Sequence, residues 1–187
     1  PVSASRLLLP TIIPPFLAAH PNIQVEVTAE SSLVDIVAAG CDAGIRYEDT
    51  LAQDMIAVSI GPRVQRFATA ASPGYLNRNG RPEHPRDLLA HACLRSRTAS
   101  GAMQSWAFER DDVVVKLEPS GPLIVRSDTS FDLAVDAAIA GLGFVHIFEG
   151  WLQPHFKCGA LEPVLEPWWQ EFSGPILYYS GNRLVPA

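Results

Sequence analysis

The pattern of hydrophobic and polar positions indicates a strand, a helix and a second strand between residues 23 and 45. Residues 23–27 alternate between apolar and polar side chains, which predicts a strand with one buried face. Residues 32–40 begin with Ser-x-x-Asp, a variant of the capping box, and end at Gly40, so they predict a helix. Residues 43–45 form a short apolar run that is typical of a strand. Strand, helix and strand in this order predict a βαβ unit, and therefore a parallel sheet.

A second unit of the same kind follows later in the chain. Residues 122–125 are strand-like, and residues 129–132 repeat the cap pattern as Thr-x-x-Asp. The helix predicted after this cap ends at Gly141, and residues 144–148 form the returning strand. Two βαβ units about a hundred residues apart predict two α/β lobes rather than one long sheet.

The remaining segments give shorter signals. A short helix entered through a proline is predicted at His84-Pro85, and strands are predicted near residues 106–108, 113–115 and 176–179. Residues 6–19 have roughly helical apolar spacing, but Pro10, Pro14 and Pro15 oppose a regular helix because each removes a donor. Periodicity alone predicts a helix here.

Composition narrows the class of protein. Apolar residues make up 48% of the chain, enough for a core, and 14 basic against 20 acidic residues give a net charge of −6. This balance argues against nucleic-acid binding by this segment itself, because phosphate neutralisation needs clustered basic residues. The longest stretch without charged residues, 7–25, contains four prolines, so we expect no membrane span.

The beginning of the chain and its cysteines favour a cytoplasmic location. The chain starts at Pro1 rather than Met, so we expect it to be part of something longer, and it shows no basic n-region or A-x-A site. Its three cysteines lie far apart without CxxC spacing, which predicts reduced thiols. We therefore expect a cytoplasmic protein.

Catalytic signatures are missing from the sequence. G-x-S-x-G, HExxH and the Walker loop are all absent, and Gly141-Leu142-Gly143 follows a helix, the wrong order for a dinucleotide site. The five histidines lack the spacing of metal ligands. We therefore expect no enzyme activity, no cofactor and no metal. His146 interrupts an apolar strand, and two interpretations stay open for it: a satisfied buried histidine or a ligand contact.

A set of short motifs in a consistent order resembles the effector-binding domain of LysR-type transcriptional regulators. The most specific part is Ala71-Ser72-Pro73-Gly74-Tyr75-Leu76, followed by Gly80, Pro82, His84-Pro85, Asp87-Leu88, His91 and Cys93-Leu94. Residues 6–21, residues 33–46, the pair Trp106 and Phe108, and residues 140–144 are similar to other stretches of the family. The order and spacing of these motifs carry the resemblance, since each motif alone is weak.

The resemblance implies an α/β fold with two Rossmann-like lobes joined by two crossing strands, as in type 2 periplasmic binding proteins. Lobe one would comprise residues 1–67 and 177–187, and lobe two residues 68–176. The family's N-terminal winged helix-turn-helix domain, the strand before Pro1 and the helix after Pro186 would be missing from this chain.

The family also implies a function. A small anionic effector is expected between the lobes, where it would allosterically control DNA binding and transcription by a homodimer or homotetramer. DNA contact would belong to the missing N-terminal domain. The alternative is a solute-binding protein of a transport system.

Helix starts and the wall of lobe two supply the candidate binding residues. Hydroxyl groups beside unpaired amides suit a small anion, although plain N-capping would also explain Ser32 and Thr129. Arg46, Arg97 and Arg126 are candidate counter-charges, with surface ion pairing as the default role. The expected ligand contacts are Ser3, Ser5, Ser31, Ser32, Ser127, Asp128, Thr98, Phe144 and His146.

Overall fold

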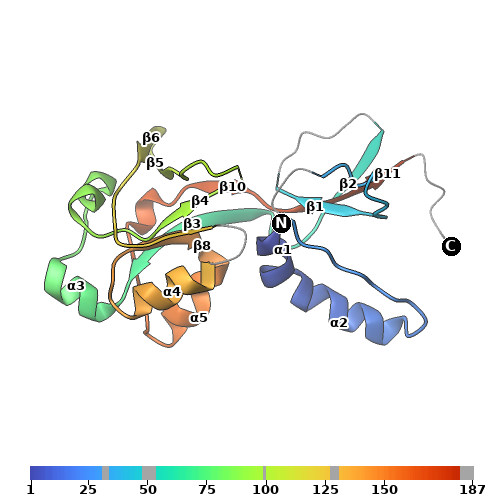
Figure 1. Ribbon diagram of the computed structural model, residues 1–187, viewed down its shortest axis with the longest axis horizontal. Helices are drawn as coiled ribbons and strands as arrows, with labels where there is room; N and C mark the ends of the chain where they lie inside the picture. The colour runs from blue at the N-terminus through green and yellow to red at the C-terminus, as the bar shows by residue number, and fades with distance from the viewer. Residues whose placement is uncertain (31–33, 48–53, 99, 127–130, 182–187) are drawn as a thin grey trace. The chain divides into compact units, whose positions relative to one another are not determined.

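The chain forms two compact units. The computed structural model describes residues 1–30, 34–47, 54–98, 100–126 and 131–181. Unit 1 comprises Pro1–Gln65 and Phe172–Ala187, and unit 2 comprises Arg66–Glu171 (Figure 1). The chain therefore passes twice between the units. The lobe boundaries at residues 67/68 and 176/177 stay a prediction.

Unit 1 begins with two helices, α1 (Val2–Leu7) and α2 (Leu9–Ala19). Pro10 lies in the first turn of α2, where its missing N–H is one that the helix would not have used. The Thr11 hydroxyl donates to the Leu8 carbonyl at 2.8 Å, and the same carbonyl accepts from the Thr11 N–H at 3.0 Å. The helix predicted over residues 6–19 is confirmed, with a break at Leu8, although Pro14 and Pro15 lie inside α2.

The sheet of unit 1 is antiparallel. It contains β1 (Gly44–Arg46), β11 (Ile176–Ser180) and β2 (Met55–Ser59) in that order. Ile45 pairs with Leu177, and Tyr178 pairs with Ala57. The prediction of a parallel βαβ unit over residues 23–45 is therefore wrong, although its last strand is present.

Residues 23–27 do not form the predicted strand. They are largely exposed, and no strand of the described residues pairs with them. A strand exists through its pairing, so an alternating pattern without a partner remains extended chain. The predicted helix at 32–40 is a single turn in its described part. Asp35 Oδ1 accepts from the N–H of Val37 at 2.9 Å, and the left-handed Gly40 (φ 71°) ends the turn, as predicted.

Unit 2 is centred on a sheet in which β3 (Val64–Ala71) pairs antiparallel with β8 (Val145–Phe148) and with β9 (Glu162–Val164). The order of neighbouring strands in this sheet is β10 (Glu171–Ser173), β3 and β8. Beside it, β4 (Arg95–Arg97) and β7 (Ile124–Arg126) form a parallel pair. A parallel bridge between Cys93 and Phe144 links this pair to the strand that continues as β8.

The second predicted βαβ unit is present as β7, α4 (Phe131–Ile139) and β8. The helix ends at Gly141 (φ 80°), where the N–H of Leu142 donates to Ala137 O at 3.1 Å. Helix α5 (Glu149–Lys157) lies against α4, because Trp151 Nε1 donates to Asp132 Oδ1 at 2.9 Å (Figure 1).

Short elements complete unit 2. Helix α3 (Pro73–Asn79) is capped by Ser72, and the 3₁₀ helix η1 (Pro85–Ala90) starts at a reciprocal His84–Asp87 cap, as the proline entry predicted. The hairpin of β5 (Trp106–Arg110) and β6 (Val113–Leu117) turns at the left-handed residues Asp111 and Asp112. A further 3₁₀ helix, η2 (Glu166–Trp168), precedes β10. No helix within the described residues is both long and apolar enough to cross a bilayer.

Candidate functional site

Two parallel strands of unit 2 end in arginine. In the β4–β7 pair, Arg97 lies directly beside Arg126, and Arg95 lies beside Ile124. Residues paired in parallel strands project to the same face, and so do residues i and i+2 of one strand. Arg95, Arg97 and Arg126 therefore share one face, and we call them the arginine row. The carboxyl ends of parallel strands are where open α/β sheets bind their ligands.

Arg95 is a buried cation held by main-chain oxygens. Only 5% of its surface is exposed. One Nη donates to the carbonyl of Pro119, and the other donates to Gln104 O at 3.2 Å. Within the described residues the partners of both Nη groups are thus carbonyl groups, which do not cancel the charge, and the buried Nε has no hydrogen-bond partner. Arg95 therefore adds a buried positive charge to the arginine row.

The turn after β4 adds hydroxyl groups. Arg97 is exposed, and its Nη1 donates to Gly101 O at 2.8 Å across the turn. Thr98 Oγ1 lies 2.8 Å from Ser100 Oγ, and the Thr98 N–H donates to Ala102 O at 2.9 Å. On the other face, Ser96 Oγ donates to Gln104 Oε1 at 2.9 Å. These bonds fix the turn that carries the Arg97 guanidinium and the Thr98 hydroxyl.

His146 is a buried, hydrogen-bonded histidine. It is 7% exposed, and its Nδ1 lies 2.8 Å from Thr69 Oγ1 on the neighbouring strand β3. Its ring contacts the rings of Phe67, Trp106 and Phe108 at centroid distances of 5.6, 5.1 and 4.9 Å. Burial lowers the pKa of His146 to about 3, so the side chain is neutral at physiological pH. The geometry matches the interpretation of a satisfied buried histidine, and a ligand contact stays a prediction.

The other predicted ligand contacts fall into three groups. Phe144 is fully buried and contacts the rings of Tyr75 and His91, so it contributes no exposed surface. Ser3 and Ser5 lie in α1, where Ser3 is buried and Ser5 Oγ donates to Val2 O at 2.8 Å. The remaining predicted contacts lie outside the described residues: Ser31, Ser32, Ser127 and Asp128, together with the cap Thr129.

The three candidate counter-charges are separated. Arg97 and Arg126 come together in unit 2, whereas Arg46 belongs to unit 1, where its guanidinium lies 4.8 Å from the centroid of the Tyr178 ring. Sequence reasoning missed Arg95. The signal was present in Arg95-Ser96-Arg97, because period two places both arginines of a strand on one face.

A comparison with protein-family models shows which family the chain belongs to. The model of the LysR substrate binding domain matches residues 1–186. The chain belongs to this family. The resemblance seen in the sequence motifs is thereby confirmed, and the chain is the effector-binding domain of a LysR-type regulator.

Relatives of this LysR domain are transcriptional regulators. A Pseudomonas aeruginosa PAO1 protein named as a transcriptional regulator is 42% identical over 178 residues, which is 95% of this chain and 56% of that protein. The HTH-type transcriptional regulator YcaN of Escherichia coli K12 is 36% identical over 182 residues, which is 97% of this chain and 58% of that protein. The chain thus spans little more than half of each relative. These names favour a regulator over a solute-binding protein.

A solved structure confirms the predicted fold class of this LysR domain. The regulatory domain of AphB from Vibrio vulnificus matches with a TM-score of 0.79 at 20% identity, covering 95% of this chain and 86% of that chain. At this identity the likeness shows the fold alone. It is the two-lobed α/β fold of the type 2 periplasmic-binding-protein kind.

The described residues offer little for catalysis. No group of three or more His, Cys, Asp or Glu side chains among them is placed to hold a metal ion. Cys93 is buried, and burial raises its thiol pKa to about 12 although the charge of Arg95 acts in the opposite direction. This thiol stays protonated and is a poor nucleophile. The arrangement at the arginine row is suited to binding an anion.

Proposed function

We propose that this LysR domain binds a small anionic effector at the arginine row and performs no reaction on it. The pairing of Arg97 with Arg126 at the carboxyl ends of β4 and β7 carries this proposal. Two guanidinium groups at paired positions on neighbouring strands can both donate to one bound anion, whose charge is opposite to theirs. A carboxylate suits the site because two parallel N–H groups of a guanidinium match its two oxygens.

The surroundings of the arginine row support an anion of modest size. Arg95 adds a buried positive charge, and Thr98 adds a hydroxyl within the turn that follows β4. In the family arrangement the effector lies between the two lobes. Further contacts outside the arginine row are also part of this proposal. They would come from the helix starts predicted around Ser3, Ser5, Ser31 and Ser32, and from Ser127 and Asp128 before α4.

The output of binding is a change in transcription. The named relatives include an HTH-type regulator that is longer than this chain, so we place DNA binding in an N-terminal domain of the full-length protein. The full-length protein would act in the cytoplasm as a homodimer or homotetramer. The effector changes the equilibrium between two states of this assembly by its difference in affinity for them, typically about 1–3 kcal/mol.

Calorimetric titration of the full-length protein with a panel of mono- and dicarboxylates tests this proposal. We expect at least one acid to bind, and Arg97→Gln to weaken its binding about tenfold or more, because a charge-assisted hydrogen bond pair is lost. Arg86→Gln is the matched control, since Arg86 is an exposed arginine on η1 away from the arginine row. Equal affinity of the wild-type protein and Arg97→Gln for every acid that binds would refute the proposal, as would the absence of any binding.

A mobility-shift assay then tests the regulatory output. The acid that binds is expected to change the affinity of the wild-type protein for DNA upstream of its own gene, and Arg97→Gln is expected to lose this response while keeping basal DNA binding. A response that survives in Arg97→Gln would separate regulation from the arginine row.

A further inference from the structure

The two segments of unit 1 that lie next to the points where the chain passes between the units are hydrogen-bonded to each other. We call residues 60–63 and 173–175 the crossing segments. The N–H of Ile60 donates to Pro175 O at 3.0 Å, and the N–H of Gly174 donates to Arg63 O at 2.8 Å. A side chain at position 174 would place its Cβ 1.7 Å from Pro62 O, so this approach requires glycine. The crossing segments therefore form a fixed main-chain frame.

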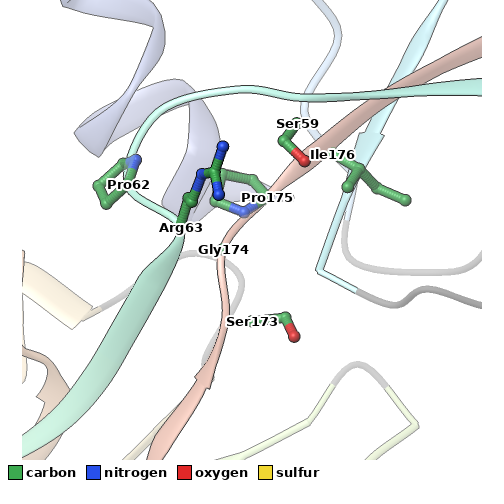
Figure 2. Close-up of a pocket in the computed structure, with 7 residues that line it drawn as sticks. All are labelled: Ser59, Pro62, Arg63, Ser173, Gly174, Pro175 and Ile176. Atoms are coloured by element: carbon green, nitrogen blue, oxygen red, sulfur yellow. The ribbon is translucent and has the colours of Figure 1, made fainter.

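A cavity of about 370 Å³ opens against this frame. Figure 2 shows Arg63 on one crossing segment, Ser59 at the end of β2 directly before that segment, and Ser173 with Gly174 on the other. All the residues that line it belong to unit 1, and none of them is acidic. The lining thus combines one guanidinium with two hydroxyl groups, which is a donor-rich and positively charged set.

The polar side chains around this cavity have no competing partners. Within the described residues, the side chains of Ser59, Arg63 and Ser173 make no hydrogen bond or ion pair. Arg63 is exposed, so its guanidinium can turn without breaking an existing contact. The volume lies near the small end of ligand sites, which span roughly 300–1,000 Å³. A small ligand with several acceptor oxygens fits these conditions.

We propose that this cavity is a second anion site, separate from the arginine row, which binds a small oxyanion through Arg63 with support from Ser59 and Ser173. The ligand chemistry is a group with two or more oxygens that share a negative charge, as in phosphate or a short carboxylate. The guanidinium fork of Arg63 pairs with two of these oxygens. Because Arg63 and Ser173 come from opposite crossing segments, a bound oxyanion links the segments and stabilises the frame.

Equilibrium dialysis of the full-length protein against radiolabelled inorganic phosphate, at constant ionic strength set with chloride, tests this site. We expect saturable binding that Arg63→Gln weakens about tenfold or more and that Ser173→Ala weakens less, since a charged donor contributes more than a neutral one. Arg86→Gln removes the same charge from an exposed arginine elsewhere and is expected to bind like the wild type. Arg63→Lys, which keeps the charge and loses the fork, is expected to bind with intermediate affinity.

Competition separates the two possible sources of the oxyanion. Displacement of phosphate by acetate at similar concentrations identifies a carboxylate as a natural ligand, and failure of acetate to compete identifies a phosphate-type anion; both support the site. Phosphate binding that is unchanged in Arg63→Gln overturns it, as does the absence of saturable phosphate binding. Phosphate binding lost in Arg97→Gln and kept in Arg63→Gln also overturns it and assigns the phosphate to the arginine row. The proposed effector function fails on a different result, namely carboxylate binding that is insensitive to Arg97→Gln.

Discussion

Unit 2 is built around large aromatic side chains, whereas the described part of unit 1 buries few side chains of any size. Trp106, Phe108 and Phe144 are almost completely removed from solvent in unit 2. In unit 1, α2 has no buried residue, and Ile12 and Phe16 on this helix are exposed. Burial of apolar surface is the main favourable term in folding, so the two units differ in what stabilises them. We infer that unit 2 carries most of the packing free energy of the described residues.

Truncating one aromatic side chain in each unit is the strongest way to test this difference. Phe108→Ala in unit 2 removes a ring with no exposed surface, and we expect a loss of about 3–5 kcal/mol in the free energy of unfolding. Phe16→Ala in unit 1 removes a ring that is 38% exposed, and we expect a loss below about 1 kcal/mol. Urea denaturation followed by circular dichroism measures both. Equal losses would mean that unit 1 has a core comparable to that of unit 2.

Glycine replacements give a second, smaller contrast. A Cβ at Gly121 in unit 2 would lie 2.0 Å from Cys93 O, so Gly121→Ala forces two main-chain segments apart, and we expect a loss of about 3 kcal/mol. At Gly40 in unit 1 a Cβ would meet nothing within 4 Å. We expect Gly40→Ala to lower the free energy of unfolding by only about 1 kcal/mol, because alanine is disfavoured in the left-handed conformation of this residue. The same denaturation series measures them. A larger loss for Gly40→Ala would contradict the comparison.

The dependence of stability on pH gives a third test, and it depends on the buried His146 of unit 2. The pKa of this side chain is about 3 in the folded protein and 6.5 in the reference state. Below pH 6.5 the unfolded chain takes up a proton that the folded protein excludes, so stability falls as the pH drops from 6.5 towards 3. At pH 5 the expected loss is about 2 kcal/mol relative to pH 7.

Replacing the imidazole isolates this effect from the other titrating groups. His146→Gln is expected to lower stability at pH 7, because it breaks the bond to Thr69 Oγ1, and to flatten the dependence on pH between 7 and 5. Thermal midpoints at half-unit pH steps measure the difference. An equally steep loss in His146→Gln would assign the pH dependence to other residues.

The contrast between the units also explains which parts of the fold could be predicted from the sequence. The βαβ segment formed by β7, α4 and β8 was predictable because its two strands, its helix and the helix end at Gly141 lie within one contiguous stretch of sequence. Residues 23–27 carry an equally clear strand pattern, but a pattern cannot supply the partner strand. The strand β3, which runs along the crossing, was missed because its apolar positions do not alternate regularly.

The candidate site was predictable in part. Arg97 and Arg126 were named as candidate counter-charges, and Thr98 as part of the wall of lobe two that the family resemblance implied; the structure places both arginines at the last positions of strands. The pairing of Arg97 with Arg126 depends on which two strands are neighbours, and local sequence does not encode that choice. The burial of Phe144 and His146 depends on rings from β3 and β5 and from residues 75 and 91, so it required the tertiary structure.

The topology of unit 1 has a consequence for biosynthesis. Within the described residues, β1 and β2 pair with no strand except β11, which comes more than a hundred residues later in the chain. At a translation rate of about 5–20 residues per second, both strands remain unpaired for several seconds or more before β11 has been synthesised. Unit 2 is a single contiguous segment that is complete before that moment. Within this domain, unit 1 therefore completes its sheet last although most of it is synthesised first, and its unpaired strand edges would be the surface that a ribosome-associated chaperone meets.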